Sequence, residues 1–329
     1  GGRKPVHIEL NRKFGYVIGL ELFKDAYSAV AVDLAGDILF SRSEHKGLPG
    51  DDVAEIVVNL LSSLREELSW VGIPLLGVGL GISGIVNSEE GIIIGSIPHQ
   101  IPEPFPLVDK ISNKIDVPVF VDNDANACAW GELAFHRTKK LRNFLFTLVE
   151  FHDDPKHMFY ENTAVGLGIV IEGKVYYGHN HSAGEFRSLF CKPEDKGQSS
   201  VSSRQDHIYK DREKLTLFFK EISQHLALFV NTFNLSQIFL GGDIERYQDI
   251  VMPILLDALA GNWMYDSPVD CEIRFSSLGD KAVAYGAAGL VLERLFADPE
   301  ALDRLGMGTW NSSKALTSLL EKKKSPGRG

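Results

Sequence analysis

One short stretch constrains the fold more than any other. Residues 119–121 form an apolar run that changes abruptly into Asp122, Asn123 and Asp124, and small helix-compatible residues follow. This pattern predicts a buried strand that feeds a helix, with Asn123 and Asp124 at the junction. In an open α/β sheet, ligands bind at the carboxyl ends of strands, where a carboxylate can accept a hydrogen bond from a hydroxyl or act as a general base.

A structural alternative exists for the same polar residues, because Asp122 or Asn123 could cap the helix. One cap accounts for one polar residue, and the stretch holds three in a row. The surplus favours Asp124 as a functional carboxylate.

Composition excludes several classes of protein. With a net charge of −10, the body of the chain lacks the basic surface that nucleic acid binding requires, and the only basic cluster lies at residues 322–328. The three cysteines Cys128, Cys191 and Cys271 are far apart and lack metal-ligand spacing, which predicts reduced thiols in a cytoplasmic protein. No apolar run is long enough to span a bilayer, so we expect no membrane partner.

The length of 329 residues predicts two lobes rather than one small core. We expect a first α/β lobe over residues 16–137 and a second over 138–298. Each opens with strands and continues with helices, which suggests a duplicated unit that faces a cleft. Residues 1–15 are interpreted as a linker and residues 299–329 as a helical tail with a basic end.

Four short sequence motifs resemble those of one known family. They are Asp-Asn-Asp-Ala-Asn-Ala at 122–127, the loop at 178–185 that ends Ala-Gly-Glu, Phe-Leu-Gly-Gly at 239–242, and Ala-Tyr-Gly-Ala-Ala at 284–288. Together they resemble the sugar-kinase-like ROK family (repressor, open reading frame, kinase) over nearly the whole chain. The resemblance implies the actin-like, hexokinase-like pair of ribonuclease-H-like lobes with a ligand cleft between them, in agreement with the two predicted lobes.

The resemblance also implies a sugar in the cleft. The family aspartate that contacts a sugar hydroxyl corresponds to Asp124, with Asn123 beside it, and the glutamate of Ala-Gly-Glu corresponds to Glu185. Gly84 lies in the turn expected near the sugar, and His99 stands where the family has an asparagine. Short acceptors and donors in fixed geometry are what vicinal hydroxyls need.

Simpler interpretations stay open for several of these residues. His99 lies between two prolines and could be an ordinary surface residue, and Glu185 could be an exposed loop charge. His179 and His181 have no cysteine or carboxylate at fixed spacing, so a metal role is not expected for them.

The phosphate-binding loop of the family kinases, Ile-Gly-Ile-Asp-Ile-Gly-Gly-Thr-Lys in character, departs strongly from its pattern here. The same register has Glu21 for the aspartate, Phe23 and Lys24 for two glycines, and Asp25 for the threonine. Backbone amides cradle a polyphosphate only where no side chain blocks the approach. The second phosphate motif, at 162–166, keeps only its threonine and its last glycine. The resemblance therefore predicts that ATP and Mg²⁺ do not bind.

The zinc signature of the family is also missing. Arg187 and Ser188 replace its Gly-His pair, and Cys191 alone represents its cysteine-rich knuckle. The resemblance predicts no zinc, and the absent histidine removes one expected sugar contact.

Residues 2–19 resemble the junction that joins a winged helix-turn-helix to the sugar-binding body in the family's repressors. Our first hypothesis is therefore the effector-binding and dimerisation body of a sugar-responsive transcriptional regulator, a repressor without catalysis or cofactor. It would be a homodimer that reaches operator DNA through a preceding domain. A second hypothesis is an ATP-dependent sugar kinase with Asp124 as general base. A third is a scaffold whose cleft is vestigial.

Overall fold

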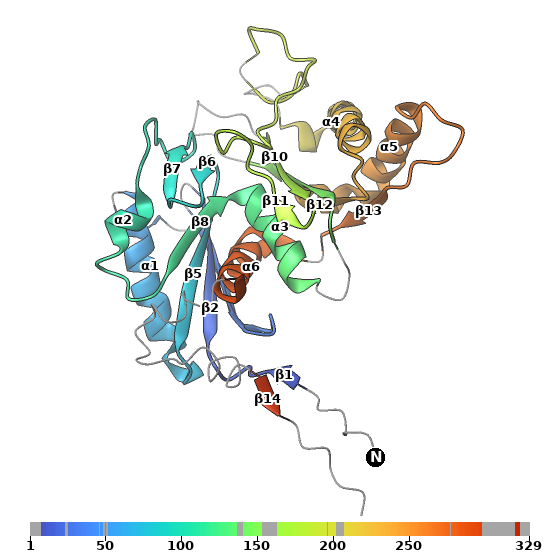
Figure 1. Ribbon diagram of the computed structural model, residues 1–329. Coiled ribbons are helices and arrows are strands. Elements are labelled where there is room, and N and C mark those ends of the chain that lie inside the picture. The colour runs from blue at the N-terminus through green and yellow to red at the C-terminus, as the bar shows by residue number, and fades with distance from the viewer. Residues whose placement is uncertain are drawn as a thin grey trace, which may run out of the picture.

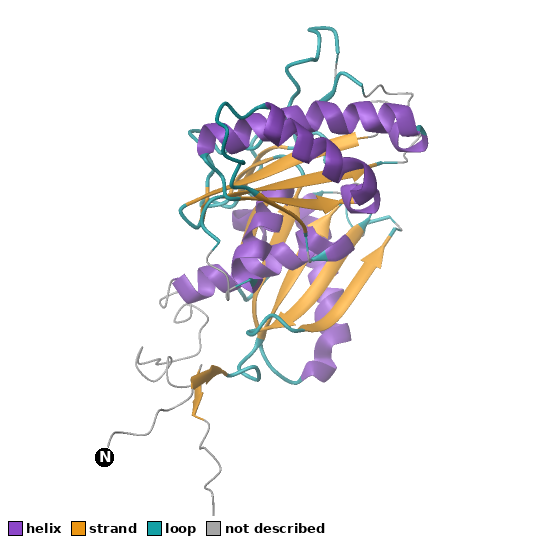
Figure 2. Cartoon of the chain, turned by 90° about the vertical axis from the view of Figure 1, so that its right-hand side faces the viewer, coloured by secondary structure: helices purple, strands orange, loops and turns teal. Residues whose placement is uncertain are grey.

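The computed structural model describes residues 8–23, 26–45, 47–48, 50, 52–136, 141–152, 163–195, 197–201, 207–276, 278–297 and 320–322. Two five-stranded mixed sheets dominate these residues, one in each half of the chain (Figure 1). Helices cover the outer faces of the sheets and fill the space between them (Figure 2).

The first sheet has the strand order β4-β3-β2-β5-β8. Its strands are β2 (Tyr16–Leu22), β3 (Tyr27–Asp33), β4 (Ile38–Glu44), β5 (Leu75–Ile82) and β8 (Val119–Asn123). The first three pair in antiparallel fashion, and β2, β5 and β8 run parallel, so their carboxyl ends share one edge. The remaining elements are α1 (Val53–Glu67), η1 (Leu68–Val71), the hairpin of β6 (Ile85–Asn87) and β7 (Ile92–Gly95), and α2 (Leu107–Ile111).

The second sheet repeats this plan with the order β11-β10-β9-β12-β13. Its strands are β9 (Phe144–Phe151), β10 (Thr163–Ile171), β11 (Lys174–Val175), β12 (Gln237–Gly242) and β13 (Glu272–Phe275). The helical elements in this half of the chain are η2 (Ile208–Lys210), α4 (Arg212–Phe233), η3 (Asp243–Tyr247), α5 (Gln248–Gly261), η4 (Gly279–Lys281) and α6 (Ala282–Ala297). The same strand order in both sheets confirms the duplicated α/β unit expected from the sequence.

The outer helices form because their apolar spacing matches one buried face. In α1, the side chain of Asp52 caps the helix by accepting a hydrogen bond from the Glu55 amide, and Val57, Leu60 and Leu64 are buried against the first sheet. In α4, Asp211 provides the cap in the same way, and Phe218, Ile222 and Leu226 enter the core of the second sheet.

Helix α3 (Asp124–Phe135) and helix α6 lie between the two sheets (Figure 1). Helix α6 packs its apolar residues against the first sheet, and α3 packs its small residues against β9 and β10. The two helices approach so closely that a Cβ at Gly286 would lie 2.0 Å from the Ala127 carbonyl oxygen. Glycine and alanine at this contact therefore hold the two halves together.

The chain ends meet in a small separate ladder, where β1 (Ile8–Leu10) pairs antiparallel with β14 (Leu320–Lys322) (Figure 1). Residues 320–322 belong to the segment predicted as a helical tail, so that prediction is wrong for them. The unpaired backbone groups of β1 allow residues 320–322 to pair with it as a strand. The spacing of apolar residues in the tail gives no information about this partner. The other residues of 299–329 lie outside the described part of the chain. None of the helices described is long and apolar enough to cross a membrane.

Candidate functional site

The predicted strand-to-helix junction is the passage from β8 to α3. Asn123 caps α3, because its Oδ1 accepts hydrogen bonds from the amides of Ala125 (2.9 Å) and Asn126 (3.2 Å). Its Nδ2 donates to the Gly84 carbonyl oxygen at 3.0 Å. The capping alternative thus holds for Asn123, and the same side chain joins the Gly84 turn to the start of α3.

Asp124 follows the cap and is half-buried. Its Oδ1 accepts a hydrogen bond of 2.7 Å from the Ala125 amide. It faces β10, since Oδ1 lies 3.5 Å from the position a Cβ would take at Gly166. Burial, and then the carboxylates of Glu150 and Glu185, raise the pKa of Asp124 to about 7. A carboxyl group with this pKa exchanges a proton near neutral pH and can bind a hydroxyl as acceptor or donor.

Glu185 lies across from Asp124, on the loop that follows β11. It forms an isolated antiparallel bridge with Gly166 of β10, and the Leu167 amide donates to the Gly184 carbonyl oxygen at 3.2 Å. The side chain is exposed, yet surrounding protein desolvates it enough to raise its pKa. The structure therefore brings Glu185 to Asp124. The alternative of an exposed loop charge is right about the exposure of the side chain, but Glu185 also lies beside the candidate site.

His99 is half-buried in the loop after β7. Its Nε2 lies 3.2 Å from the Leu22 carbonyl oxygen, and its amide donates to Ser96 Oγ at 3.3 Å. Ser96 Oγ donates in turn to the Ser83 carbonyl oxygen at 2.6 Å. His99 therefore ties the turn that contains Gly84 to the carboxyl end of β2.

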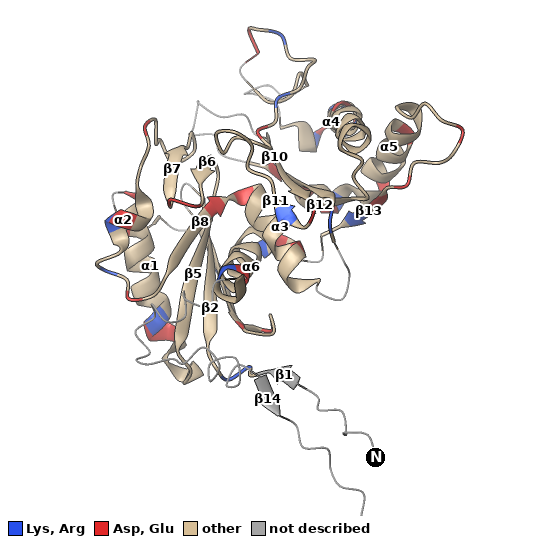
Figure 3. Cartoon of the chain, viewed as in Figure 1, with Lys and Arg blue, Asp and Glu red and all other residues tan. Residues whose placement is uncertain are grey.

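Two further carboxylates enter the same region, at equivalent places in the two sheets. Glu21 is the penultimate residue of β2, and Glu150 is the penultimate residue of β9. Burial and then Glu150 raise the pKa of Glu21 well above its ordinary value, and burial and Asp243 raise that of Glu150 to about 7. Sequence reasoning missed Glu150, although the duplication would have indicated it. Figure 3 shows acidic residues gathered where β8 meets α3.

Asp122 is fully buried and forms a second network that the sequence did not indicate. Its Oδ2 accepts hydrogen bonds from the Tyr177 hydroxyl (2.6 Å) and Trp130 Nε1 (3.2 Å), and its Oδ1 accepts from Asn126 Nδ2 (3.3 Å). Tyr177 precedes the loop that carries Glu185. Asp122 therefore holds that loop against the carboxyl end of β8.

The turn after β2 has lost the geometry of a phosphate cradle. The Phe23 amide donates to the Ala26 carbonyl oxygen at 2.9 Å, so this backbone donor is already used within the turn. A phenylalanine side chain also occupies a position where bare backbone would have to approach an anion. Lys24 and Asp25 lie outside the described residues.

The residues of the zinc-knuckle region do not fit zinc. Arg187 donates hydrogen bonds to the carbonyl oxygens of Lys192 (3.2 Å), Asp195 (2.6 Å) and Gly197 (3.3 Å). Cys191 Sγ contacts the last of these carbonyls at 3.8 Å. Within the described ranges, no three His, Cys, Asp or Glu side chains are grouped to hold a metal ion, His179 and His181 included.

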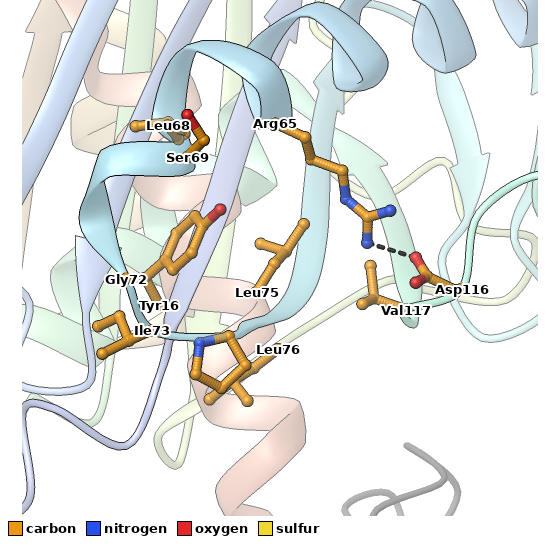
Figure 4. A pocket seen from close by; sticks show the side chains of 11 residues that line it. Tyr16, Arg65, Leu68, Ser69, Gly72, Ile73, Leu75, Leu76, Asp116 and Val117 are labelled. Carbon is orange, nitrogen blue, oxygen red and sulfur yellow. Dashed lines mark hydrogen bonds and ion pairs between the residues drawn. The ribbon is translucent and has the colours of Figure 1, made fainter.

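A shallow groove of about 430 Å³ lies at the opposite end of the first sheet (Figure 4). Tyr16 and Leu75 line it at the amino ends of β2 and β5, and Arg65 and Asp116 form an ion pair at its rim. Since ligands of α/β sheets bind at the carboxyl ends of strands, we place the candidate site at Asp124 and not in this groove.

Two lobes with the same strand order, and acidic side chains at facing strand ends, define a protein of the actin-like two-lobe class. The family model "ROK family" matches residues 17–197, and the chain belongs to this family.

Relatives include both repressors and kinases. The chain is 24% identical over 325 residues to a xylose repressor of Bacillus spizizenii, covering 89% of this chain and 81% of the relative. It is 32% identical over 180 residues to a glucokinase of Streptomyces coelicolor, covering 55% and 51%. A crystal structure of a ROK family transcriptional regulator, described as a homolog of the E. coli MLC protein, superposes with a TM-score of 0.71 at 19% identity, over 91% of this chain and 82% of that one. The last likeness bears on the fold alone.

Proposed function

We propose that this chain is the effector-binding body of a sugar-responsive transcriptional repressor that binds its sugar without catalysis. The observation that carries the proposal is a contrast between the residues around Asp124 and the turn after β2. Asp124, Asn123 and Glu185 converge where hydroxyl groups could be held, whereas the Phe23 turn uses its own amide and blocks an approach to phosphate. The likeness to a xylose repressor supports an aldose as effector.

Operator DNA would be contacted by another part of the full protein. The body has a net charge of −10, and a phosphate backbone requires clustered Lys and Arg. Binding of the sugar between the two sheets would shift their relative position, and this shift is limited by the difference in affinity between the open and closed states.

The body would form a homodimer through the exposed side of α4. Leu217 and Leu228 are 48% and 46% exposed and lie on one face, about three helical turns apart. Leu189 and Phe190 of the neighbouring loop are 78% and 54% exposed, and the loop packs on α4 through His225. Exposed large apolar side chains on one element and its neighbouring loop are typical of an interaction site. Sedimentation of Leu228→Glu as a monomer would support this face, and an unchanged dimer would refute it.

Isothermal titration tests the effector site directly. The unchanged protein is titrated with D-xylose, D-glucose and other aldoses, beside Asp124→Ala and Asp257→Ala. Asp257 is an exposed carboxylate of α5 and serves as the matched control. Loss of a charged hydrogen-bond acceptor should weaken binding by roughly 30-fold in Asp124→Ala and leave Asp257→Ala unaffected. Absence of binding to every sugar by the unchanged protein would refute the proposal.

The second candidate is a sugar kinase, which the likeness to a glucokinase favours. Asp124 has a pKa of about 7, which suits a general base that takes the proton of an attacking sugar hydroxyl. A coupled assay with Mg²⁺-ATP and the same aldoses separates the two functions. Turnover that disappears in Asp124→Asn would establish the kinase, whereas sugar binding without turnover or ATP binding supports the regulator.

A further inference from the structure

His181 has two irregularities and one ring contact, and it lies in the loop that presents Glu185. Its φ is 62°, in the left-handed region that residues other than glycine rarely enter. Its Nδ1 is buried without a hydrogen-bond partner among the described residues. Its ring packs at 6.2 Å on Tyr177, whose hydroxyl is held by Asp122. A strained residue of this kind is a reason to look for a function.

The enclosed Nδ1 determines which ring nitrogen carries the proton. A proton on Nδ1 would be a buried donor without an acceptor, which costs free energy. A ring proton is therefore placed on Nε2, which does not need a buried acceptor. Nε2 makes no hydrogen bond to the described residues and is not enclosed, so this N–H is an accessible donor.

The loop geometry places His181 on the same turn as Glu185. The Ala183 amide donates to the Tyr177 carbonyl oxygen at 3.2 Å, and the Glu185 amide donates to the Ser182 carbonyl oxygen at 3.3 Å. These bonds fold residues 177–185 into a compact turn. His181 is thereby held at the same turn as Glu185, which bridges to Gly166 opposite Asp124.

The site is otherwise dominated by acceptors. Ionised Asp124 and Glu185 can only accept hydrogen bonds, and Asn123 already gives one of its amide hydrogens to Gly84. A sugar hydroxyl that donates to a carboxylate still has an oxygen that needs a donor. We propose that His181 is a specificity-determining residue that donates from Nε2 to one hydroxyl oxygen of the bound aldose. This inference rests on the proposed function and names a further contact at the same site.

Three substitutions separate a ligand contact from a purely structural role. His181→Gly removes the ring and adopts a positive φ freely, His181→Asn tolerates this φ but is too short, and His181→Gln is strained but reaches the Nε2 position. If His181 contacts the sugar, affinity depends on whether the new side chain extends as far as Nε2 does. The Gln variant should then retain more binding than the Asn or Gly variant. If the residue is only structural, both stability and affinity follow tolerance of the positive φ, with Gly first and Gln last.

The experiment is a titration of the full chain and the three variants with D-xylose, D-glucose and their single-deoxy analogues, together with urea unfolding. We expect His181→Gly to be at least as stable as the unchanged protein, yet to bind roughly five- to tenfold more weakly. We also expect it to lose discrimination against one deoxy analogue. Equal binding by His181→Gly and the unchanged protein would overturn this inference alone. Failure of the unchanged protein to bind any of these sugars would overturn the proposed function and this contact together.

Discussion

The Tyr177 hydroxyl donates a 2.6 Å hydrogen bond to Oδ2 of the buried Asp122. Trp130 Nε1 lies within hydrogen-bond distance of Asp122 Oδ2 and of the Tyr177 hydroxyl oxygen. This contact joins the carboxyl end of β8 to the loop that carries Glu185. Burial and the adjacent Asp122 carboxylate raise the pKa of Tyr177, so the phenol remains a neutral donor.

Removal of this hydroxyl should loosen the loop. Tyr177→Phe leaves a buried carboxylate short of one partner and should lower the free energy of unfolding by about 1–3 kcal/mol. It should also weaken sugar binding, because Glu185 would be less well placed. Urea unfolding and isothermal titration measure the two effects. Tyr176→Phe is the matched control, since Tyr176 is 52% exposed and adjacent. Equal effects of the two substitutions would contradict the positioning role of Asp122.

Stability should fall as pH rises, because folding raises the pKa of Asp124 and Glu150 to about 7. The folded state therefore holds more protons than the unfolded chain between about pH 4 and pH 7. The contribution of each group is present in full below its ordinary pKa and is lost as pH rises through 7. Between pH 5 and pH 8 this should lower the free energy of unfolding by on the order of 2 kcal/mol for each group.

Urea unfolding at several pH values checks this directly. Asp124→Asn and Glu150→Gln should each flatten the pH dependence and stabilise the protein at pH 8, and Asp257→Asn should follow the unchanged protein. A stability that is constant between pH 5 and pH 8 would contradict the burial of these carboxylates.

Sugar affinity should change with pH in the opposite direction. A hydroxyl donates more strongly to an ionised carboxylate, so affinity should fall below pH 7 as Asp124 takes up a proton, by at most about tenfold for each pH unit. Titrations at pH 5.5, 7 and 8.5 test this. The same dependence in Asp124→Asn would show that another group is responsible.

Sequence patterns identified the elements that local chemistry determines. The change from an apolar run to Asp122, Asn123 and Asp124 located the β8-to-α3 junction, and the order of strands and helices indicated the duplication. Apolar spacing does not name tertiary partners, so the bond from Asp122 to Tyr177 and the approach of Glu150 to Asp124 could not be predicted. The packing of α6 on α3 depends on backbone contact at Gly286, which small residues permit but do not specify.

The loop that replaces the zinc knuckle should depend on Arg187 and not on metal. Arg187 holds three carbonyl oxygens of the loop, but it is exposed, so water weakens each bond. Arg187→Ala should lower the free energy of unfolding by about 1 kcal/mol, and EDTA should leave thermal unfolding of the unchanged protein unaltered. Arg212→Ala is a control, because Arg212 is an exposed arginine whose carboxylate partner lies at 3.6 Å. A fall in the unfolding temperature on chelation would contradict this account.

Gly184 should be the least replaceable residue of the loop at residues 177–185. Its φ is +96°, and a Cβ there would lie 1.9 Å from the Leu167 carbonyl oxygen, a rigid backbone atom of β10. Gly279 also has a positive φ, of +67°, but a Cβ there would meet nothing within 4 Å. Gly279→Ala should therefore cost only the conformational penalty of about 1–2 kcal/mol. Gly184→Ala should cost this penalty and also displace Glu185 from β10, so that sugar binding is lost. Urea unfolding and titration of both variants compare the two costs. Retention of sugar affinity in Gly184→Ala would show that the contact between Gly184 and Leu167 does not position Glu185.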